Sequence, residues 1–291
     1  MLPHILRQAT VWLLVATLCA AQSDIKFMYL YKNAKTSNNQ AIKTKGFNAL
    51  SIFGVDLKTS GDIVWKLSVL DGSPDVTLAS NGSYVGGSDY ANLIKAYKTG
   101  NTHIDRVEVT LGQYQNIKTQ VGQGIGPSTT LYRNLAALKH AWNLDAITND
   151  DEAEYDLSST VKFALMLGRI GYKFTAAPYT EIDYWAELVS QVNGNTSGLF
   201  DRAYLQCYDG GAGNDPSQWI DSLKIPIIPL LWVTNDAKPA DSMTPQQSQS
   251  QFQNWTDNDR ISGGGYWNNY DIEKQNSSYS AYANVLNQVF G

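Results

Sequence analysis

The sequence is poor in the residues that most often build metal sites and nucleophile–base pairs: its 291 residues include only 2 cysteines and 3 histidines. Cys19 lies in an apolar amino-terminal segment, so Cys207 has no partner elsewhere and no intramolecular disulfide is expected. We interpret Cys207 as a buried, inert thiol. The segments Cys-x-x-Cys, His-Glu-x-x-His and Gly-x-Ser-x-Gly are absent, as is a phosphate-binding glycine loop. We therefore expect chemistry based on carboxylates and aromatic side chains, with no metal and no cofactor.

A second long apolar run is also lacking. The one such run, VWLLVATLCAA at 11–21, follows Arg7 and ends in small residues, the pattern of a secretory signal peptide cleaved after Ala20 or Ala21. It is shorter than the ~20 residues that span a bilayer. We therefore expect a secreted protein without a membrane anchor, with residues 22–291 forming a single domain.

Excess positive charge is absent as well. Without Arg7 the remaining chain has 21 basic residues against 27 acidic ones, a formal charge of −6. An acidic surface argues against nucleic acid as a partner. Secretion by a eukaryote agrees with four glycosylation sequons, which begin at Asn81, Asn195, Asn254 and Asn276. We expect a monomer.

Strand-like and helix-like segments alternate along the chain. Segments rich in β-branched and aromatic residues predict eight strands, at 25–33, 49–57, 104–112, 144–150, 173–179, 202–209, 225–233 and 263–273. Helical patterns fall at 89–100, 130–142, 157–171, 180–192, 216–223, 244–255 and 277–290. This alternation predicts an α/β fold, the (β/α)8 or TIM barrel. Residues 58–88 are more strand-like than helical and predict a β-rich insertion after the second strand.

The segment DAITNDDE at 145–152 holds the candidate catalytic acids. It is expected to be a strand whose exit carries Asp150 and Glu152 on one face, with Cα atoms roughly 6.5 Å apart. Two carboxyl groups that close can split their pKa values, so that one keeps its proton near neutral pH. General acid catalysis of glycoside cleavage requires such a group. A solvated acidic loop is the alternative; a calcium site is a weaker one, because the glycine-turned spacing of an EF-hand loop is absent.

This segment resembles the DxxDxDxE motif on the fourth barrel strand of family 18 glycoside hydrolases, which include chitinases and endo-β-N-acetylglucosaminidases. Asp145, Asp150 and Glu152 match the motif, whereas Thr148 replaces an aspartate. Three weaker similarities follow other strands. They are VTLGQ (109–113) in place of SxGG, LQCYD (205–209) with Tyr208 at a substrate-facing tyrosine, and GGGYW (263–267) with Trp267 at a tryptophan under the sugar.

The resemblance implies a substrate-assisted mechanism, in which the N-acetyl group of the sugar attacks its own anomeric carbon. Glu152 would protonate the leaving oxygen, and Asp150 would orient the acetamido group. Tyr208 would bind the acetamido oxygen. The expected substrate-binding residues are Trp267 as an apolar floor, Gln113 and Gln206 as donors to sugar hydroxyls, and Asp145, Tyr179 and Tyr270. The expected partner is an oligosaccharide or polysaccharide.

Thr148 is the main departure from the motif. Because threonine in place of aspartate removes a buried negative charge, Asp150 is expected to be less repelled and to have a lower pKa. We therefore keep three hypotheses open. They are a glycosidase on β-linked N-acetylglucosamine, a catalytically inactive chitinase-like lectin or inhibitor, and a glycosidase on a sugar without the N-acetyl group.

Overall fold

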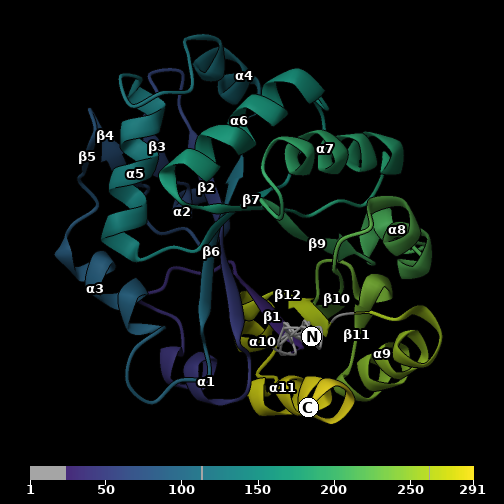
Figure 1. Ribbon diagram of the computed structural model, residues 1–291. Helices are drawn as coiled ribbons and strands as arrows, with labels where there is room; N and C mark the ends of the chain where they lie inside the picture. The colour runs from purple at the N-terminus through teal and green to yellow at the C-terminus, as the bar shows by residue number, and fades with distance from the viewer. Residues whose placement is uncertain (1–23, 113, 262) are drawn as a thin grey trace, which may run out of the picture.

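The computed structural model describes residues 24–112, 114–261 and 263–291. The expected signal peptide at 1–21 and Gln113 therefore lie outside the described residues. Within these ranges, eight strands run parallel around a barrel (Figure 1). They are β1 (Ile25–Leu30), β2 (Ala49–Leu57), β6 (Arg106–Gly112), β7 (Ala146–Asn149), β8 (Lys173–Ala176), β9 (Phe200–Gln206), β10 (Ile227–Val233) and β12 (Gly263–Trp267).

The barrel closes at its first strand. Phe27 on β1 is paired with Ala49 on β2 and also with Gly265 on β12, so β1 has a parallel neighbour on each side. The other strands follow in the order β12, β10, β9, β8, β7, β6 and β2. The predicted (β/α)8 barrel is therefore confirmed.

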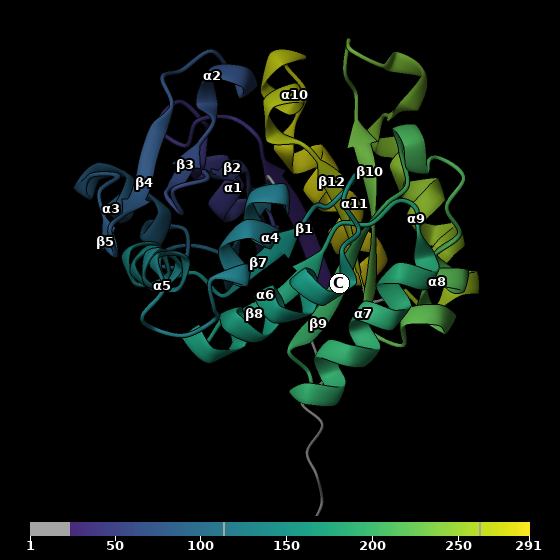
Figure 2. The same ribbon diagram turned by 90° about the horizontal axis from the view of Figure 1, so that it is seen from above.

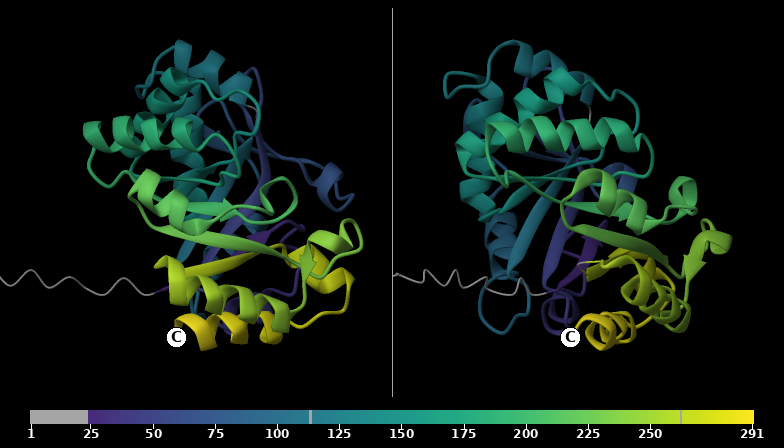
Figure 3. Two further views of the ribbon diagram at one scale, coloured as in Figure 1. Left: turned by 90° about the vertical axis from the view of Figure 1, so that its right-hand side faces the viewer. Right: turned by 45° about the vertical axis from the view of Figure 1, so that its right-hand side comes forward.

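Helices cover the outside of the barrel (Figures 1 and 3). They are α1 (Asn39–Thr44), α4 (Tyr114–Gly122), α5 (Thr130–Trp142), α6 (Leu157–Ile170), α7 (Ile182–Asn195), α8 (Pro216–Leu223), α9 (Pro245–Asp259) and α11 (Tyr279–Phe290). α6 shows the local logic: Asp156 caps its first turn by accepting the N–H of Ser159, and Gly171 ends it in the left-handed conformation. None of the described helices is long and apolar enough to cross a membrane.

The last predicted strand is too long. Strand β12 ends at Trp267, and residues predicted as strand up to 273 form helix α10 (Asn269–Lys274) instead. The side chain of Asn268 caps this helix by accepting the N–H of Asp271 at 3.1 Å, which favours helix over strand there. The other predicted strands are present, with ends that differ by up to three residues, and helices α1 and α4 were not expected.

The predicted β-rich insertion is confirmed. Strand β3 (Ile63–Trp65) pairs antiparallel with β2, and β4 (Val76–Ser80) and β5 (Ser83–Tyr84) extend the sheet outward. The short helix α2 (Leu67–Leu70) lies within the insertion, and α3 (Ser88–Ala96) follows it. In Figure 2, α2, α10 and the loop after β10 project from the same end of the barrel.

The barrel interior has two chemically different sides. Apolar side chains, among them Phe27 and Leu230, fill the side formed by β1, β10 and β12. Gly265 on β12 is required there, because a Cβ atom would lie 2.7 Å from the Cβ of Phe27. On the side of β6, β7 and β8 the interior is polar. The carboxylate of Glu108 and several hydroxyl side chains, among them Thr148, are fully buried there.

Candidate active site

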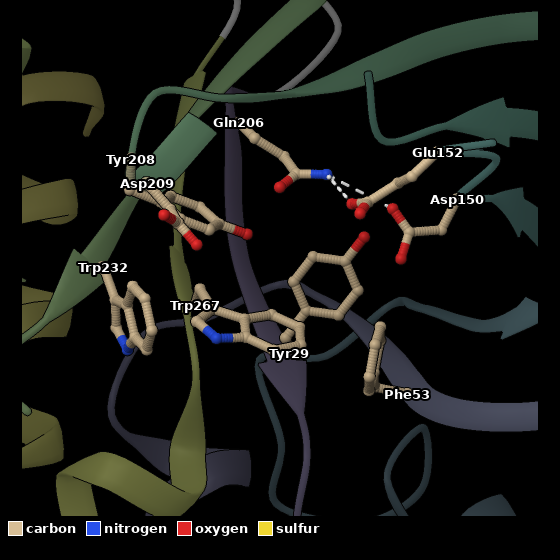
Figure 4. A pocket seen from close by; sticks show the side chains of 9 residues that line it. All are labelled: Tyr29, Phe53, Asp150, Glu152, Gln206, Tyr208, Asp209, Trp232 and Trp267. Carbon is tan, nitrogen blue, oxygen red and sulfur yellow. Dashed lines mark hydrogen bonds between the residues drawn. The ribbon is translucent and has the colours of Figure 1, made fainter. Parts of the chain in front are cut away.

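A cavity of about 220 Å³ opens at the carboxyl ends of the barrel strands (Figure 4). This is the end at which barrel enzymes place their active sites. Its lining consists of Tyr29, Phe53, Asp150, Glu152, Gln206, Tyr208, Asp209, Trp232 and Trp267. Of the residues predicted from the sequence, it brings together Asp150, Glu152, Gln206, Tyr208 and Trp267.

Asp150 and Glu152 reach the cavity from the end of β7, as expected. The side-chain amide nitrogen of Gln206 lies 3.3 Å from Oδ1 of Asp150 and 3.1 Å from Oε1 of Glu152 (Figure 4). The same nitrogen donates to the carbonyl oxygen of Ala177 at 2.8 Å, which fixes it between β8 and β9. Gln206 therefore holds the two acids side by side.

The acid between them has a structural role. Asp151 is buried and accepts the backbone N–H groups of Ala153, Glu154 and Tyr155 at 2.8–3.1 Å. These bonds fold the chain into a tight loop directly after the strand. Because Asp151 turns inward, Asp150 and Glu152 are left facing the cavity.

The pKa of Asp150 is raised to about 8, first by burial and then by the neighbouring charges of Glu152 and Asp151. We expected a lower pKa because Thr148 removes a buried acid of the motif. The structure instead holds Asp150 well above its ordinary value. At neutral pH, Asp150 therefore carries a proton and can donate a hydrogen bond.

Tyr29 and Tyr208 add two hydroxyl groups to the cavity. Burial raises the pKa of both phenols well above the ordinary value, and the charge of Asp150 raises them further. Both therefore remain protonated donors at neutral pH. The hydroxyl of Tyr29 is buried, lies beside Thr110 and points toward Asp150 in Figure 4.

An aromatic wall faces the acids. The Trp267 ring lies 4.6 Å from Phe53, 5.0 Å from Tyr29 and 6.3 Å from Tyr208, measured between centroids. Trp232 extends this wall, and its indole N–H donates to Oδ2 of Asp271 at 2.8 Å. Flat apolar surfaces beside a few polar groups suit a sugar ring.

Two further cavities adjoin the first one. One of about 280 Å³ shares Glu152, Gln206 and Asp209 with it and includes the predicted Tyr179. The other, of about 290 Å³, shares Trp232 and Trp267 and includes the predicted Tyr270. Tyr179 and Tyr270 therefore line two different cavities, each of which shares part of its lining with the central one.

Asp145 does not reach the site, so its assignment to substrate binding is wrong. It precedes β7 at the opposite end of the barrel, where it accepts from Lys98 at 2.7 Å and from the N–H of Val107 at 2.8 Å. Its role is to join strand ends.

Sequence reasoning missed several residues of the site. Tyr29, Phe53 and Trp232 line the cavity from β1, β2 and β10. Their signal was partial: each is an aromatic residue within a predicted strand, but only Trp232 is near the carboxyl end of its strand. Tyr114 on α4 was also missed; its hydroxyl accepts the N–H of Asp150 at 2.6 Å and donates to Leu111, which anchors the start of the acid loop.

Cys207 is buried and free among the described residues, in agreement with its interpretation as an inert thiol, and burial raises its pKa. The described residues contain no group of three or more histidine, cysteine or acidic side chains arranged to hold a metal ion.

No model of a known protein family matches the sequence, and no curated protein matches it. Solved structures do share its fold. The catalytic domain of a family 18 chitinase from the fern Peteris ryukyuensis is 12% identical, with a TM-score of 0.59 over 91% of this chain and 98% of that one. A Pyrococcus furiosus chitinase domain, solved with chito-oligosaccharides, gives the same identity and TM-score over 92% and 95%.

A protein described as an agglutinin is equally similar. The chitinase-like agglutinin of Robinia pseudoacacia is 12% identical, with a TM-score of 0.59 over 92% of this chain and all of that one. The chain therefore has the fold of the family 18 chitinases, a fold that also occurs in a chitinase-like agglutinin.

Proposed function

We propose that this protein is a glycosidase that cleaves β-linked N-acetylglucosamine glycans with retention of configuration, assisted by the N-acetyl group of the substrate. The observation that carries the proposal is the pair of Glu152 and Asp150, held by Gln206 opposite an aromatic wall. Chitin-like chains and the chitobiose core of N-glycans are the candidate substrates.

Glu152 is the proton donor in this proposal. Its side chain is exposed to the cavity, where a glycosidic oxygen can reach it. Protonation of that oxygen makes the leaving sugar a neutral alcohol, which lowers the barrier to bond cleavage. The aromatic wall of Trp267 and Tyr208 would hold the ring that loses this bond.

The position of the acids favours a nucleophile from the substrate. Asp150 and Glu152 leave the same strand end, so they face the sugar from one side, whereas a retaining enzyme with its own nucleophile places carboxylates on both sides. A third carboxylate, Asp209, lies across the cavity in Figure 4, but it is ion-paired with Lys238. In the proposed reaction the acid pair holds one proton, which passes from Asp150 to Glu152 and then to the leaving oxygen as the glycosidic bond breaks. Asp150, now a carboxylate, accepts the N–H of the acetamido group, and Tyr208 orients this group as its oxygen forms the bond to the anomeric carbon.

A carbohydrate-binding protein without catalysis is the second candidate. Thr148 in place of the motif aspartate favours it, as does the similarity to the Robinia pseudoacacia agglutinin. Glu152 argues for the enzyme, because a binding protein does not need a proton donor in the cavity.

A screen of the purified protein against chitooligosaccharides and high-mannose glycans tests the proposal, with Glu152→Gln as the control. Product release by the wild type that is lost in the variant supports the glycosidase. Calorimetric binding of the same glycans without any product would favour the lectin instead. Neither binding nor cleavage on the whole panel would contradict both.

We also propose that the protein is secreted as a glycosylated monomer. The asparagines of the four sequons, Asn81, Asn195, Asn254 and Asn276, are all exposed, which supports access by the glycosylation machinery. Mass spectrometry of the native protein tests this proposal. It should find an amino terminus near Ala21 or Gln22 and glycan at one or more of these asparagines; an intact Met1 with bare asparagines would contradict it.

A further inference from the structure

A fully buried carboxylate, Glu108, lies on β6 inside the barrel. Its oxygens accept hydrogen bonds from Thr148 at 2.9 Å, from Thr175 at 2.7 Å and from Tyr204 at 2.6 Å. It is also ion-paired with Arg106. The strands β6, β7, β8 and β9 thus meet at this one side chain.

The charge of Glu108 is retained despite burial. Desolvation acts against it, but Arg106 and Arg202 outweigh that effect and lower the pKa of Glu108. Arg106 is itself held by two bonds to Asp201, at 2.8 and 3.1 Å. Burying an ion pair costs several kcal/mol per ion before its compensating contacts are counted. Apolar side chains of similar volume usually fill a protein interior equally well. Packing alone therefore does not explain why a charged group with these contacts lies inside the barrel.

A row of hydroxyl groups leads from Glu108 toward the active site. Thr148 Oγ1 lies 3.3 Å from Ser51 Oγ, which lies 2.8 Å from Thr110 Oγ1. Thr110 and Asp150 line the same small cavity of about 170 Å³. Thr148 gives its only hydroxyl proton to Glu108, so an unbroken row requires Ser51 to donate to Thr148 and Thr110 to donate to Ser51.

This direction has a consequence for Asp150. Every proton of the row points toward the Glu108 carboxylate, so Thr110 presents lone pairs, not a proton, to its neighbour Tyr29. The Tyr29 hydroxyl, which points toward Asp150 in Figure 4, then directs its proton to Thr110 and its lone pairs to Asp150. An acceptor beside Asp150 favours its protonated form over its carboxylate. Thr148 joins Glu108 to this row. It occupies the position at which the motif of the family 18 glycoside hydrolases has an acid.

We propose that Glu108 supplies, from the neighbouring strand β6, the buried acid that β7 lacks at position 148, and that it acts as a positioning residue for Asp150. It would act through the row formed by Thr148, Ser51, Thr110 and Tyr29. The inference rests on the proposed function, because Asp150 is the group that it serves.

Other ionisable groups face this system and must stay unchanged in any test. Around Asp150 they are Tyr29 on β1, Tyr114 on α4, Tyr208 on β9, and Asp151 and Glu152 in its own loop. Around Glu108 they are Arg106 on its own strand and Asp201, Arg202 and Tyr204 on β9.

A swap of the acid between strands tests the proposal. Thr148→Asp completes the motif, but it places a second carboxyl group beside Glu108, and like charges that close cannot both ionise. We expect kcat to fall at least ~10-fold in this variant, since contacting residues couple strongly. In Thr148→Asp combined with Glu108→Gln, one acid is again present, and kcat should return to within about 3-fold of wild type.

Thr148→Val is the second variant, with Thr148→Ser as its matched control. Valine keeps the shape but breaks the row, so Thr110 becomes free to donate to Tyr29, and Tyr29 to donate to Asp150. The pKa of Asp150 should then fall, whereas serine should preserve it. Carbon NMR titration of Asp150, assigned by its absence in Asp150→Asn, measures this without any need for activity.

The two proposals fail in different ways. Absence of hydrolysis by the wild type would contradict the glycosidase, while the NMR titration would still decide the role of Glu108. An Asp150 titration that is the same in wild type, Thr148→Val and Thr148→Ser would overturn that role. If the wild type hydrolyses its substrate, full activity of Thr148→Asp would also overturn that role, because Glu108 would then serve stability alone.

Discussion

Replacing Glu152 by glutamine is the sharpest perturbation of the proposed mechanism. The substitution preserves the size of the side chain and its position beside Gln206, whose amide nitrogen lies 3.1 Å from Oε1 of Glu152. What it removes is the transferable proton. Asp150 remains protonated at neutral pH, but it is less exposed than Glu152 and keeps its contact with Gln206 at 3.3 Å.

The expected loss follows from the role of a general acid. Such groups contribute about 10²–10⁴-fold to the rate, or roughly 3–5 kcal/mol of the barrier. We therefore expect kcat on chitooligosaccharides to fall at least ~100-fold in Glu152→Gln. Binding should change little, by less than about threefold, because the aromatic wall is untouched.

The assay compares initial rates by chromatography of the released oligosaccharides, with binding measured by calorimetry. Glu154→Gln is the matched control, because Glu154 is an exposed acid two residues further along that does not line the cavity. It should retain wild-type kcat. Turnover by Glu152→Gln close to that of Glu154→Gln would refute the reasoning.

Three further predictions concern other residues of the cavity. The pKa of Asp150 is about 8 in the folded protein against an ordinary 3.8, so the folded state holds a proton that the unfolded chain loses first. Its contribution to stability is therefore complete below about pH 4 and is lost as the pH rises to about 8. Asp150→Asn should thus gain thermal stability relative to wild type over this interval, and a difference that calorimetry finds independent of pH would contradict the shift. Trp267→Ala removes much of the aromatic wall and should weaken glycan binding about 10-fold in calorimetry; unchanged affinity would place the sugar elsewhere. Asp209→Asn should lower kcat less than ~10-fold, whereas a loss on the order of 10⁴-fold would identify Asp209 as a nucleophile.

Much of the barrel could be predicted because its strands are marked by composition. Segments such as 49–57 and 225–233 are dense in β-branched and apolar residues, and they form β2 and β10. The end of β12 was harder, because its exit is decided by a single capping side chain, Asn268. A strand pattern does not reveal such a cap.

The acid pair could be predicted because both residues belong to one strand end. Asp145 was misplaced for a reason that the geometry of a strand explains. It is five residues before Asp150, which at about 3.3 Å per residue puts it roughly 16 Å away, at the other end of the barrel. An odd spacing also turns its side chain to the other face.

The support under Asp150 could not be predicted from the sequence. Glu108 meets Thr148, Thr175 and Tyr204, which are 40, 67 and 96 residues away along the chain. Only the register of four neighbouring strands brings them together. For the same reason the local sequence does not show that Tyr29 and Phe53 point into the barrel. Their direction is decided when the barrel closes.

The central claim is that the N-acetyl group of the substrate acts as the nucleophile. Proton NMR of the first product tests it most directly, using chitotetraose and its fully de-N-acetylated counterpart as matched substrates. The account predicts cleavage of chitotetraose to a product that first appears as the β anomer, with no cleavage of the de-N-acetylated chain. Equal cleavage of both substrates, or a product that first appears as the α anomer, would contradict it.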